Sequence, residues 1–352
     1  MSVVGLFPEF RNGHPGGIQA SASTAWAAVS EKREVSLLCY EKSQTNGNSR
    51  VHAILGAVKQ AKPADILLVW QVGMLKLLPF FRTPPKNVVL FLHGIEIWKQ
   101  QDWLTRRLLK RVDVFLTNSD YTWQRFLSHS PELASVCHQT VWLGMDAPLT
   151  ADPEPPDAVP KAVMLSRLSQ TEDYKGHREL ISAWSLVVEK IPTAQLLIAG
   201  DGDLRAELEQ LVEKNKLTAS VRFLGRISES EKQQLLESSR CLLMPSRAEG
   251  FGLVYLEAMR LGRPCLVSTV DAGREVVNPP EAGLAANPNN EEELAKSICR
   301  LLADGPEWEQ WSEQARRRYE ENFTAKHFQE RLLAALFAEK MPAATQSQSR
   351  EL

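Results

Sequence analysis

The sequence predicts an α/β protein with two doubly wound, Rossmann-like domains that face a cleft. Short apolar runs alternate with stretches of helical spacing, a proline-rich segment interrupts this pattern near residue 150, and the alternation then restarts. With 352 residues, 43% of them apolar, the chain is long enough to bury two cores. Continuous apolar runs of this length indicate strands buried on both faces, so we expect parallel sheets.

The first domain is predicted from the strand-like runs that are bounded by Gly, Pro or Asp. Between them, helical spacing is found in residues 18–29, 51–61 and 98–111. Strand, helix and strand in this order are typical of a doubly wound fold. The predicted strands are residues 3–7, 34–40, 65–70, 87–93, 112–117 and 139–143.

The second domain begins after five prolines between residues 148 and 160. Ser228 and Glu231 have the spacing of a capping box that opens a helix. We expect an N-terminal Rossmann-like domain at 1–150, a proline-rich linker at 151–160, a C-terminal domain at 161–322, a helix at 323–340 able to pack back on the first domain, and a disordered tail at 341–352. The predicted strands here are 162–168, 196–200, 221–225, 241–245 and 264–268, with helices at 178–189, 204–214, 291–303 and 307–322.

Composition excludes several classes of protein. The net charge of −2 gives no footprint for nucleic acid, although residues 1–150 carry 16 Lys and Arg against 11 Asp and Glu. The five cysteines are far apart and mostly lie in apolar runs, so neither a zinc site nor a disulfide framework is indicated. The sequence shows no signal-peptide pattern and no apolar stretch that spans a bilayer. We therefore expect a cytoplasmic protein.

The strongest candidate for a site is the segment from Glu249 to Glu257, which follows a predicted strand and enters a helix. Glycines let the backbone turn here, so the amides of Phe251, Gly252 and Leu253 can point at an anion with the helix dipole behind them. Such a loop suits a diphosphate. Taken alone, the two carboxylates are more readily explained as surface residues that flank a core helix.

The surrounding motifs decide between these interpretations. The segment resembles the Glu-x7-Glu motif of the retaining GT-B glycosyltransferases of family four (group 1), with Gly-Phe-Gly after the first Glu. The resemblance implies that Glu249 is catalytic and contacts the donor sugar together with Phe251 and Gly252, and that Glu257 binds the nucleotide ribose. Arg167 in Ser-Arg-Leu and Lys175 in Lys-Gly match the pair that binds the donor phosphates, and Gly252 and Leu253 complete that set. The motifs occur in the family's order, through residues 198–202 and the strand end before Arg226, which is expected near the nucleotide base.

The N-terminal half matches the family only in patches. Gly16 and Gly17 precede a predicted helix, and the resemblance implies that they face the donor phosphates. His93 ends a predicted strand and becomes the second candidate catalytic residue, although such a histidine is more often structural. Residues 98–111 combine tryptophans and leucines with Lys and Arg, so they are either a core helix with a charged face or a basic amphipathic helix on an anionic membrane.

The reaction implied is hexosyl transfer with retention of configuration, from a nucleoside diphosphate sugar (UDP-, GDP- or ADP-linked) to a hydroxyl of a glycan or lipid-linked acceptor. The sugar nucleotide is a co-substrate, and no cofactor is expected. Asp201-Gly202-Asp203 has the Asp-x-Asp pattern with which a different glycosyltransferase fold holds a divalent metal, but it lies in a turn after a strand, and the family generally works without metal. No metal is therefore expected. Arg274 stands where the family usually has Pro, so no role is assigned to Glu275. A sugar-nucleotide epimerase of the same fold and an inactive nucleotide-sugar binding module are the alternatives.

Overall fold

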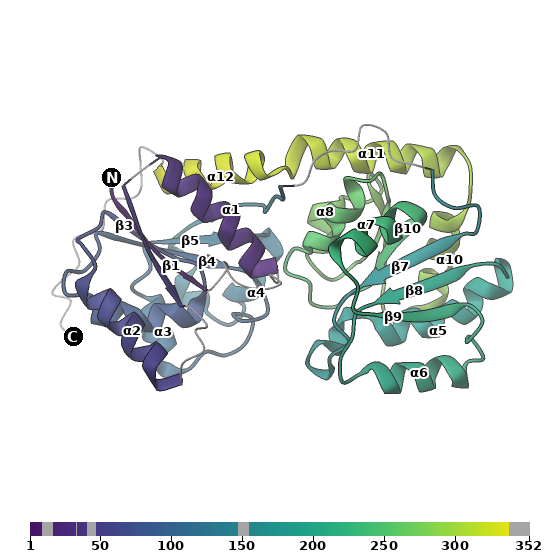
Figure 1. The fold of residues 1–352 in the computed structure, drawn as a ribbon, viewed down its shortest axis with the longest axis horizontal. Coiled ribbons are helices and arrows are strands. Elements are labelled where there is room, and N and C mark those ends of the chain that lie inside the picture. Colours follow the sequence, from purple (N-terminus) through teal and green to yellow (C-terminus); the bar gives the residue numbers. More distant parts are fainter. Residues whose placement is uncertain (9–16, 33, 41–46, 147–154, 338–352) are drawn as a thin grey trace. The chain divides into compact units, whose positions relative to one another are not determined.

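The computed structural model describes residues 1–8, 17–32, 34–40, 47–146 and 155–337. The chain forms two compact units (Figure 1). The first combines Met1–Asp146 with the end of the chain from Ala325, and the second is Ala147–Thr324. Within the described residues, no helix is both long and apolar enough to cross a bilayer.

The first unit is built on a parallel sheet of six strands in the order β2-β1-β3-β4-β5-β6. Its central strands β3 and β5 are completely buried, as expected for strands covered on both faces. The strands are β1 (Val3–Pro8), β2 (Val35–Tyr40), β3 (Ile66–Val69), β4 (Asn87–Leu92), β5 (Val114–Thr117) and β6 (Cys137–Thr140).

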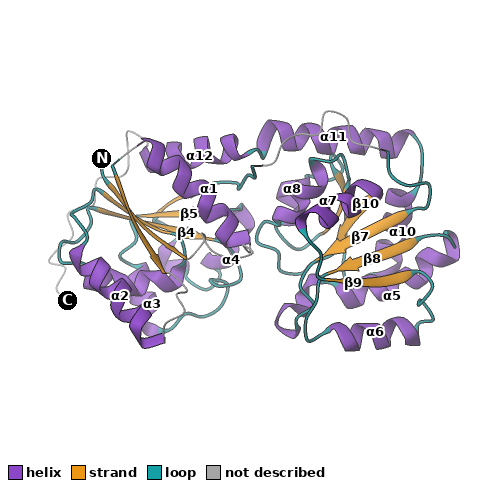
Figure 2. Cartoon of the chain, viewed as in Figure 1, coloured by secondary structure: helices purple, strands orange, loops and turns teal. Residues whose placement is uncertain are grey.

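Helices flank this sheet (Figure 2). The first helix α1 packs against the last helix α12, and α2 and α3 both contact the 3-10 segment η1. The chain thus returns to its first unit at its end, where the amide of Ala325 donates to the carbonyl of Met145 over 3.0 Å. The helical elements are α1 (Gly17–Lys32), α2 (Gly47–Gln60), η1 (Val72–Phe80), α3 (Trp103–Leu109), α4 (Asp120–Leu127), η2 (Pro131–Leu133) and α12 (Ala325–Phe337).

The second unit repeats the architecture with the strand order β12-β11-β10-β7-β8-β9, again entirely parallel. Strands β7 to β9 extend the sheet in one direction and β10 to β12 in the other, so the strand order reverses between β7 and β10. Open α/β sheets bind ligands beyond the strand ends at such a switch point. The strands are β7 (Lys161–Leu165), β8 (Gln195–Ala199), β9 (Val221–Gly225), β10 (Cys241–Met244), β11 (Cys265–Ser268) and β12 (Gly283–Ala286).

Two groups of helices pack on this second sheet. Helix α5 contacts α6 and α10, while α8 contacts α9 and α11. Ser228 and Glu231 form the predicted capping box at the start of α7. The helices are η3 (Gln170–Lys175), α5 (His177–Lys190), α6 (Arg205–Lys214), α7 (Glu229–Ser238), α8 (Leu253–Met259), α9 (Gly273–Val277), α10 (Glu291–Leu302) and α11 (Pro306–Asn322).

The predicted fold class of two doubly wound α/β domains is confirmed, and some element bounds are corrected. The run expected as a strand at 139–143 is β6 at Cys137–Thr140, which pairs with β5 through half-exposed residues. The helix expected at 98–111 is only Trp103–Leu109, because the Asp102 side chain caps it by accepting from the amide of Thr105. Strand β12 was not predicted, since a four-residue Gly-Leu-Ala-Ala strand carries little pattern.

Candidate active site

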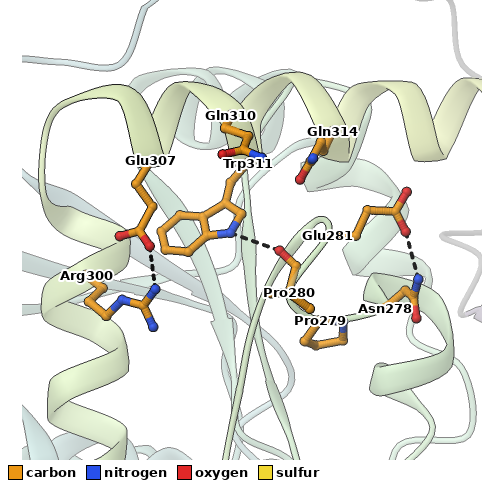
Figure 3. A pocket seen from close by; sticks show the side chains of 9 residues that line it. All are labelled: Asn278, Pro279, Pro280, Glu281, Arg300, Glu307, Gln310, Trp311 and Gln314. Atoms are coloured by element: carbon orange, nitrogen blue, oxygen red, sulfur yellow. Dashed lines mark hydrogen bonds and ion pairs between the residues drawn. The ribbon is translucent and has the colours of Figure 1, made fainter.

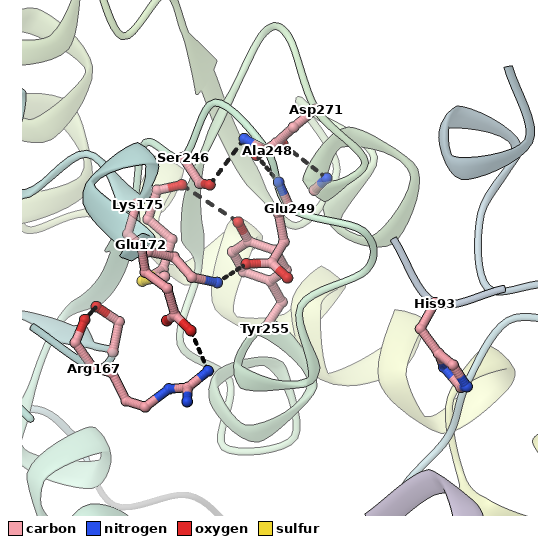
Figure 4. Close-up of polar contacts among 12 residues, drawn as sticks. His93, Arg167, Glu172, Lys175, Ser246, Ala248, Glu249, Tyr255 and Asp271 are labelled. Carbon is pink, nitrogen blue, oxygen red and sulfur yellow. Dashed lines mark hydrogen bonds and ion pairs between the residues drawn. The ribbon is translucent and has the colours of Figure 1, made fainter. Parts of the chain in front are cut away.

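The two loops that flank the switch point of the second sheet meet in an ion pair. Lys175 ends the segment after β7, and Glu249 lies in the loop after β10, the neighbouring strand. The Lys175 Nζ lies 2.6 Å from the Glu249 Oε2, and both side chains are 15% exposed (Figure 4). The structure therefore brings together two residues predicted to bind neighbouring parts of one donor, its diphosphate and its sugar.

The surroundings of Lys175 favour its charged form. Burial, the largest single influence, lowers the Lys175 pKa, but Glu249, Tyr174 and Glu172 together outweigh it, so the Lys175 pKa is raised. Gly176 has a φ of +90°, and a Cβ there would lie 2.4 Å from the carbonyl oxygen of Pro245. Only glycine lets the two loops approach this closely, which is why Lys-Gly precedes α5.

The loop that carries Glu249 is shaped by Gly252. Its φ is +85°, and a Cβ would lie 2.3 Å from the ring of Tyr255, so no other residue fits without movement. Gly252 is the N-cap of α8, and no side chain caps this first turn, which begins at Leu253. Phe251 is 2% exposed and its ring packs against Phe323, so the predicted contact to a sugar is open only to its backbone.

Glu257 lies in the second turn of α8 and is paired with a lysine that was not predicted. The Nζ of Lys232, on α7, lies 2.9 Å from the Glu257 carboxylate and 2.8 Å from that of Glu229. Burial raises the pKa of Glu257, and Lys232 partly offsets this. A ligand that bonds Glu257 therefore competes with Lys232.

The two predicted arginines are exposed. Arg167 follows β7, its side chain is 79% exposed, and its guanidinium pairs with Glu172. Arg226 follows β9, the edge strand, and is also exposed. Arg167 lies on the same strand end as the Lys175 segment, whereas Arg226 is two strands away across the sheet.

Asp271 was missed by the sequence reasoning. It is 1% exposed, follows β11, and accepts hydrogen bonds from the amides of Glu249 (3.1 Å) and Gly273 (3.0 Å). The bond to the amide two residues ahead is an Asx turn, and Asp-x-Gly after a buried strand is the signal that could have revealed it. Burial, and then the charge of Glu249, raise the pKa of Asp271 to about 8.

In the first unit, His93 follows β4 and is buried. Its Nε2 lies 2.7 Å from the carbonyl oxygen of Trp70, and the Asn118 side chain donates to the carbonyl oxygen of His93 over 2.6 Å. Burial lowers the pKa of His93, so the ring is neutral, and the Nε2 proton bonded to Trp70 leaves Nδ1 as an acceptor. Gly17 begins α1, and Gly16 lies outside the described residues.

A pocket of about 370 Å³ lies in the second unit, apart from these residues (Figure 3). The loop from Asn278 to Glu281 precedes β12, so the pocket is at the amino-terminal edge of the sheet, opposite the strand ends that carry Lys175 and Glu249. Trp311 bonds the carbonyl oxygen of Pro280 over 2.9 Å at its wall. None of the predicted donor-binding residues lines it.

Comparison with solved structures identifies the fold. The chain aligns with sucrose-phosphate synthase from Thermosynechococcus elongatus at a TM-score of 0.77 and 18% identity, covering 96% of this chain and 100% of that one. Anabaena HepE, solved with UDP and glucose, aligns at 0.72 and 18% identity over 96% and 99%. The fold is therefore that of the GT-B glycosyltransferases, as the sequence predicts.

Residues 151–318 match the family described as glycosyl transferases group 1. The second unit therefore matches this family, and the predicted resemblance is confirmed. A GDP-mannose-dependent monoacylated alpha-(1-6)-phosphatidylinositol monomannoside mannosyltransferase from Corynebacterium glutamicum is 29% identical over 236 residues, 62% of this chain and 61% of that one. The O-antigen chain mannosyltransferase C of Escherichia coli is 30% identical over 44% of this chain and 41% of its own length. The matches thus span less than two thirds of these relatives.

Proposed function

We propose that this chain is a retaining glycosyltransferase that moves a hexose from a nucleoside diphosphate sugar to an acceptor hydroxyl. The observation that carries the proposal is the Lys175 and Glu249 pair at the switch point of the second sheet. A lysine suited to the leaving diphosphate and a carboxylate suited to sugar hydroxyls are 2.6 Å apart. One small ligand can therefore contact both.

The chemistry requires positioning and charge stabilisation. Lys175 and the exposed guanidinium of Arg167 neutralise the negative charge that grows on the diphosphate as the bond to the sugar breaks, and charge-assisted bonds of this kind contribute roughly 1.5–3 kcal/mol each. The backbone amides of Gly252 and Leu253, at the start of α8, add to this. Glu249 holds the sugar hydroxyls and Glu257 the ribose, which fixes the reacting carbon.

The donor and acceptor classes are inferred from the relatives. Two of them carry mannosyltransferase names, one of which includes GDP-mannose, and HepE is solved with UDP and glucose. We therefore assign a UDP- or GDP-linked hexose as the donor, with an ADP-linked one as the remaining candidate. The names of the relatives point to a lipid-linked or glycan acceptor.

A basic surface in the first unit supports the proposal of a lipid-linked acceptor. At the start of α3, Trp103 is 68% exposed, and Arg106, Arg107 and Lys110 are also exposed. An exposed tryptophan beside cations is suited to an anionic lipid surface. We propose that this surface contacts the cytoplasmic face of a membrane. The described cysteines Cys137, Cys241, Cys265 and Cys299 are free thiols, which agrees with a reducing compartment.

The test is incubation of the full chain with radiolabelled UDP-, GDP- and ADP-hexoses, with and without lipid and glycan acceptors, followed by separation of the products. Release of nucleoside diphosphate together with a labelled α-linked product is the expected result. An epimerised sugar nucleotide without release would replace the proposal by an epimerase. Tight donor binding without any turnover would replace it by a binding module.

A further inference from the structure

Asp271 bonds the main chain of the proposed catalytic residue. Its Oδ2 accepts from the amide of Glu249 (3.1 Å), and the next amide, that of Ala272, donates to the Glu249 carbonyl oxygen (3.1 Å). Both backbone polar groups of Glu249 are therefore held by residues 271 and 272, in the loop after the neighbouring strand β11 (Figure 4). The other carboxylate oxygen accepts from Gly273, which fixes the Asp271 side chain itself.

Burial of a charged carboxylate at position 271 costs desolvation free energy. Asp271 is 1% exposed and close enough to the Glu249 carboxylate that burial and like charge raise its pKa to about 8. A neutral acceptor bonds the same amides at a smaller desolvation cost than a charged carboxylate. Buried titratable groups with pKa values shifted this far cluster at functional sites.

The loop after β10, which carries Glu249, and the loop after β11, which carries Asp271, both pack against Tyr255. The hydroxyl of Tyr255 donates to the carbonyl of Met244 over 3.3 Å, and the ring fills the space beside both loops. A Cβ on Gly252 would lie 2.3 Å from this ring, and one on Gly273 would lie 2.9 Å from its hydroxyl oxygen. The bonds from Asp271 thus tie together two loops that already pack on one rigid side chain.

We propose that Asp271 is a positioning residue for glycosyl transfer, which sets where the Glu249 carboxylate meets the donor sugar. The inference rests on the proposed function. Asp271 is 1% exposed and both of its carboxyl oxygens bond backbone amides, so its effect on turnover passes through Glu249. Donor binding through Arg167 and Glu257 is largely independent of it, because these residues lie on other elements.

A double-mutant cycle tests this coupling. We expect Asp271→Ala to lower kcat on the order of 10²-fold, the effect of displacing a catalytic group by about 1 Å, with KM for the donor changed by less than about threefold. In the Glu249→Gln background the same substitution should lower kcat by less than about twofold, because the group that it positions is already gone. Asp271→Asn keeps one acceptor oxygen and should give an intermediate loss.

The controls separate positioning from general destabilisation. Asn290→Ala also removes a side-chain acceptor from a backbone amide, that of Glu293 (3.1 Å), in the same unit, and should leave kcat unchanged. If Asp271→Ala does not fold, the same double-mutant cycle with Asp271→Asn and Glu249→Gln tests the inference. Equal losses in both Glu249 backgrounds, or a loss confined to KM, would overturn the inference. An inactive wild-type chain with every donor would instead count against the proposed function.

Discussion

The Lys175 ammonium and the Glu249 carboxylate are in contact across 74 positions of sequence. This contact exists because β7 and β10 are adjacent in the second sheet although two strands separate them along the chain. Each residue is predicted to bind a different part of the donor, so a donor bound as predicted would contact both members of one ion pair. The fold thus pairs two charged candidate ligand-binding groups at its strand ends.

Loss of the Glu249 charge should abolish most activity. Glu249→Gln keeps the shape of the side chain but weakens every hydrogen bond to a sugar hydroxyl that develops charge, so we expect kcat to fall by roughly 10²-fold or more. Initial rates of nucleoside diphosphate release measure this. Glu292→Gln, an exposed glutamate at the start of α10, is the control. Turnover like that of the wild type in Glu249→Gln would remove Glu249 from the mechanism.

Loss of the Lys175 charge should act on both binding and stability. Lys175→Met leaves the largely buried Glu249 carboxylate without its partner, so we expect about 1–3 kcal/mol of lost unfolding free energy together with weaker donor binding. Calorimetric titration with the active sugar nucleotide and denaturant unfolding measure the two effects. Adding Glu249→Gln should restore stability but not binding, and Lys190→Met serves as the exposed control. Unchanged donor affinity in Lys175→Met would contradict the phosphate assignment.

Gly252 and Gly305 both have a positive φ, so their alanine variants can be compared. Gly252→Ala should lose about 1–3 kcal/mol of stability from its positive φ, and most turnover as well, because its Cβ meets Tyr255 and displaces the Glu249 loop. Gly305 also has a positive φ, but a Cβ there has nothing within 4 Å. Gly305→Ala should therefore lose stability and keep its kcat. Equal kcat in the two folded variants would show that the loop shape is unimportant.

Acid sensitivity of the second unit should involve His177. This residue is buried, its Nε2 lies 2.7 Å from Ser166 Oγ, and burial lowers its pKa from 6.5 to about 4. The unfolded chain therefore binds more protons between these values, so stability that is present above pH 6.5 is lost as the pH falls towards 4. The loss attributable to His177 reaches up to about 3 kcal/mol.

The measurement is the free energy of unfolding between pH 7.5 and 4.5. His177→Gln should remove the rise of stability with pH that this ring contributes. The remaining pH dependence includes His138, whose pKa burial also lowers to about 4, and Asp271, whose pKa is raised to about 8 and which acts in the opposite direction. An unchanged slope in His177→Gln would mean that the ring is protonated without cost in the folded chain.

The parts of the site that the sequence reveals are those carried by local motifs. Arg167, Lys175, Glu249 and Glu257 lie beside glycines and strand ends, and they were selected because these motifs resemble those of the family in the same order. Their roles toward a donor remain predictions.

Residues that act through tertiary contacts were not predictable in this way. Lys232 and Asp271 come from other elements and carry no pattern of their own beyond a capped helix and an Asx turn. The helix expected at 98–111 was too long because apolar spacing continues through Trp98, which is buried outside the helix. An apolar residue that is buried before a helix has the same pattern as one inside it, so only the cap at Asp102 marks where the helix begins.

The return of α12 to the first unit affects how the chain is made. Phe328 packs against Trp70, so this unit needs a helix that begins at Ala325, near the end of the sequence. During synthesis, the second unit has its whole sequence available first, although it comes later in the chain. The N-terminal fragment must wait on the ribosome for its last helix, and a deletion that begins at residue 325 would damage the unit that was translated first.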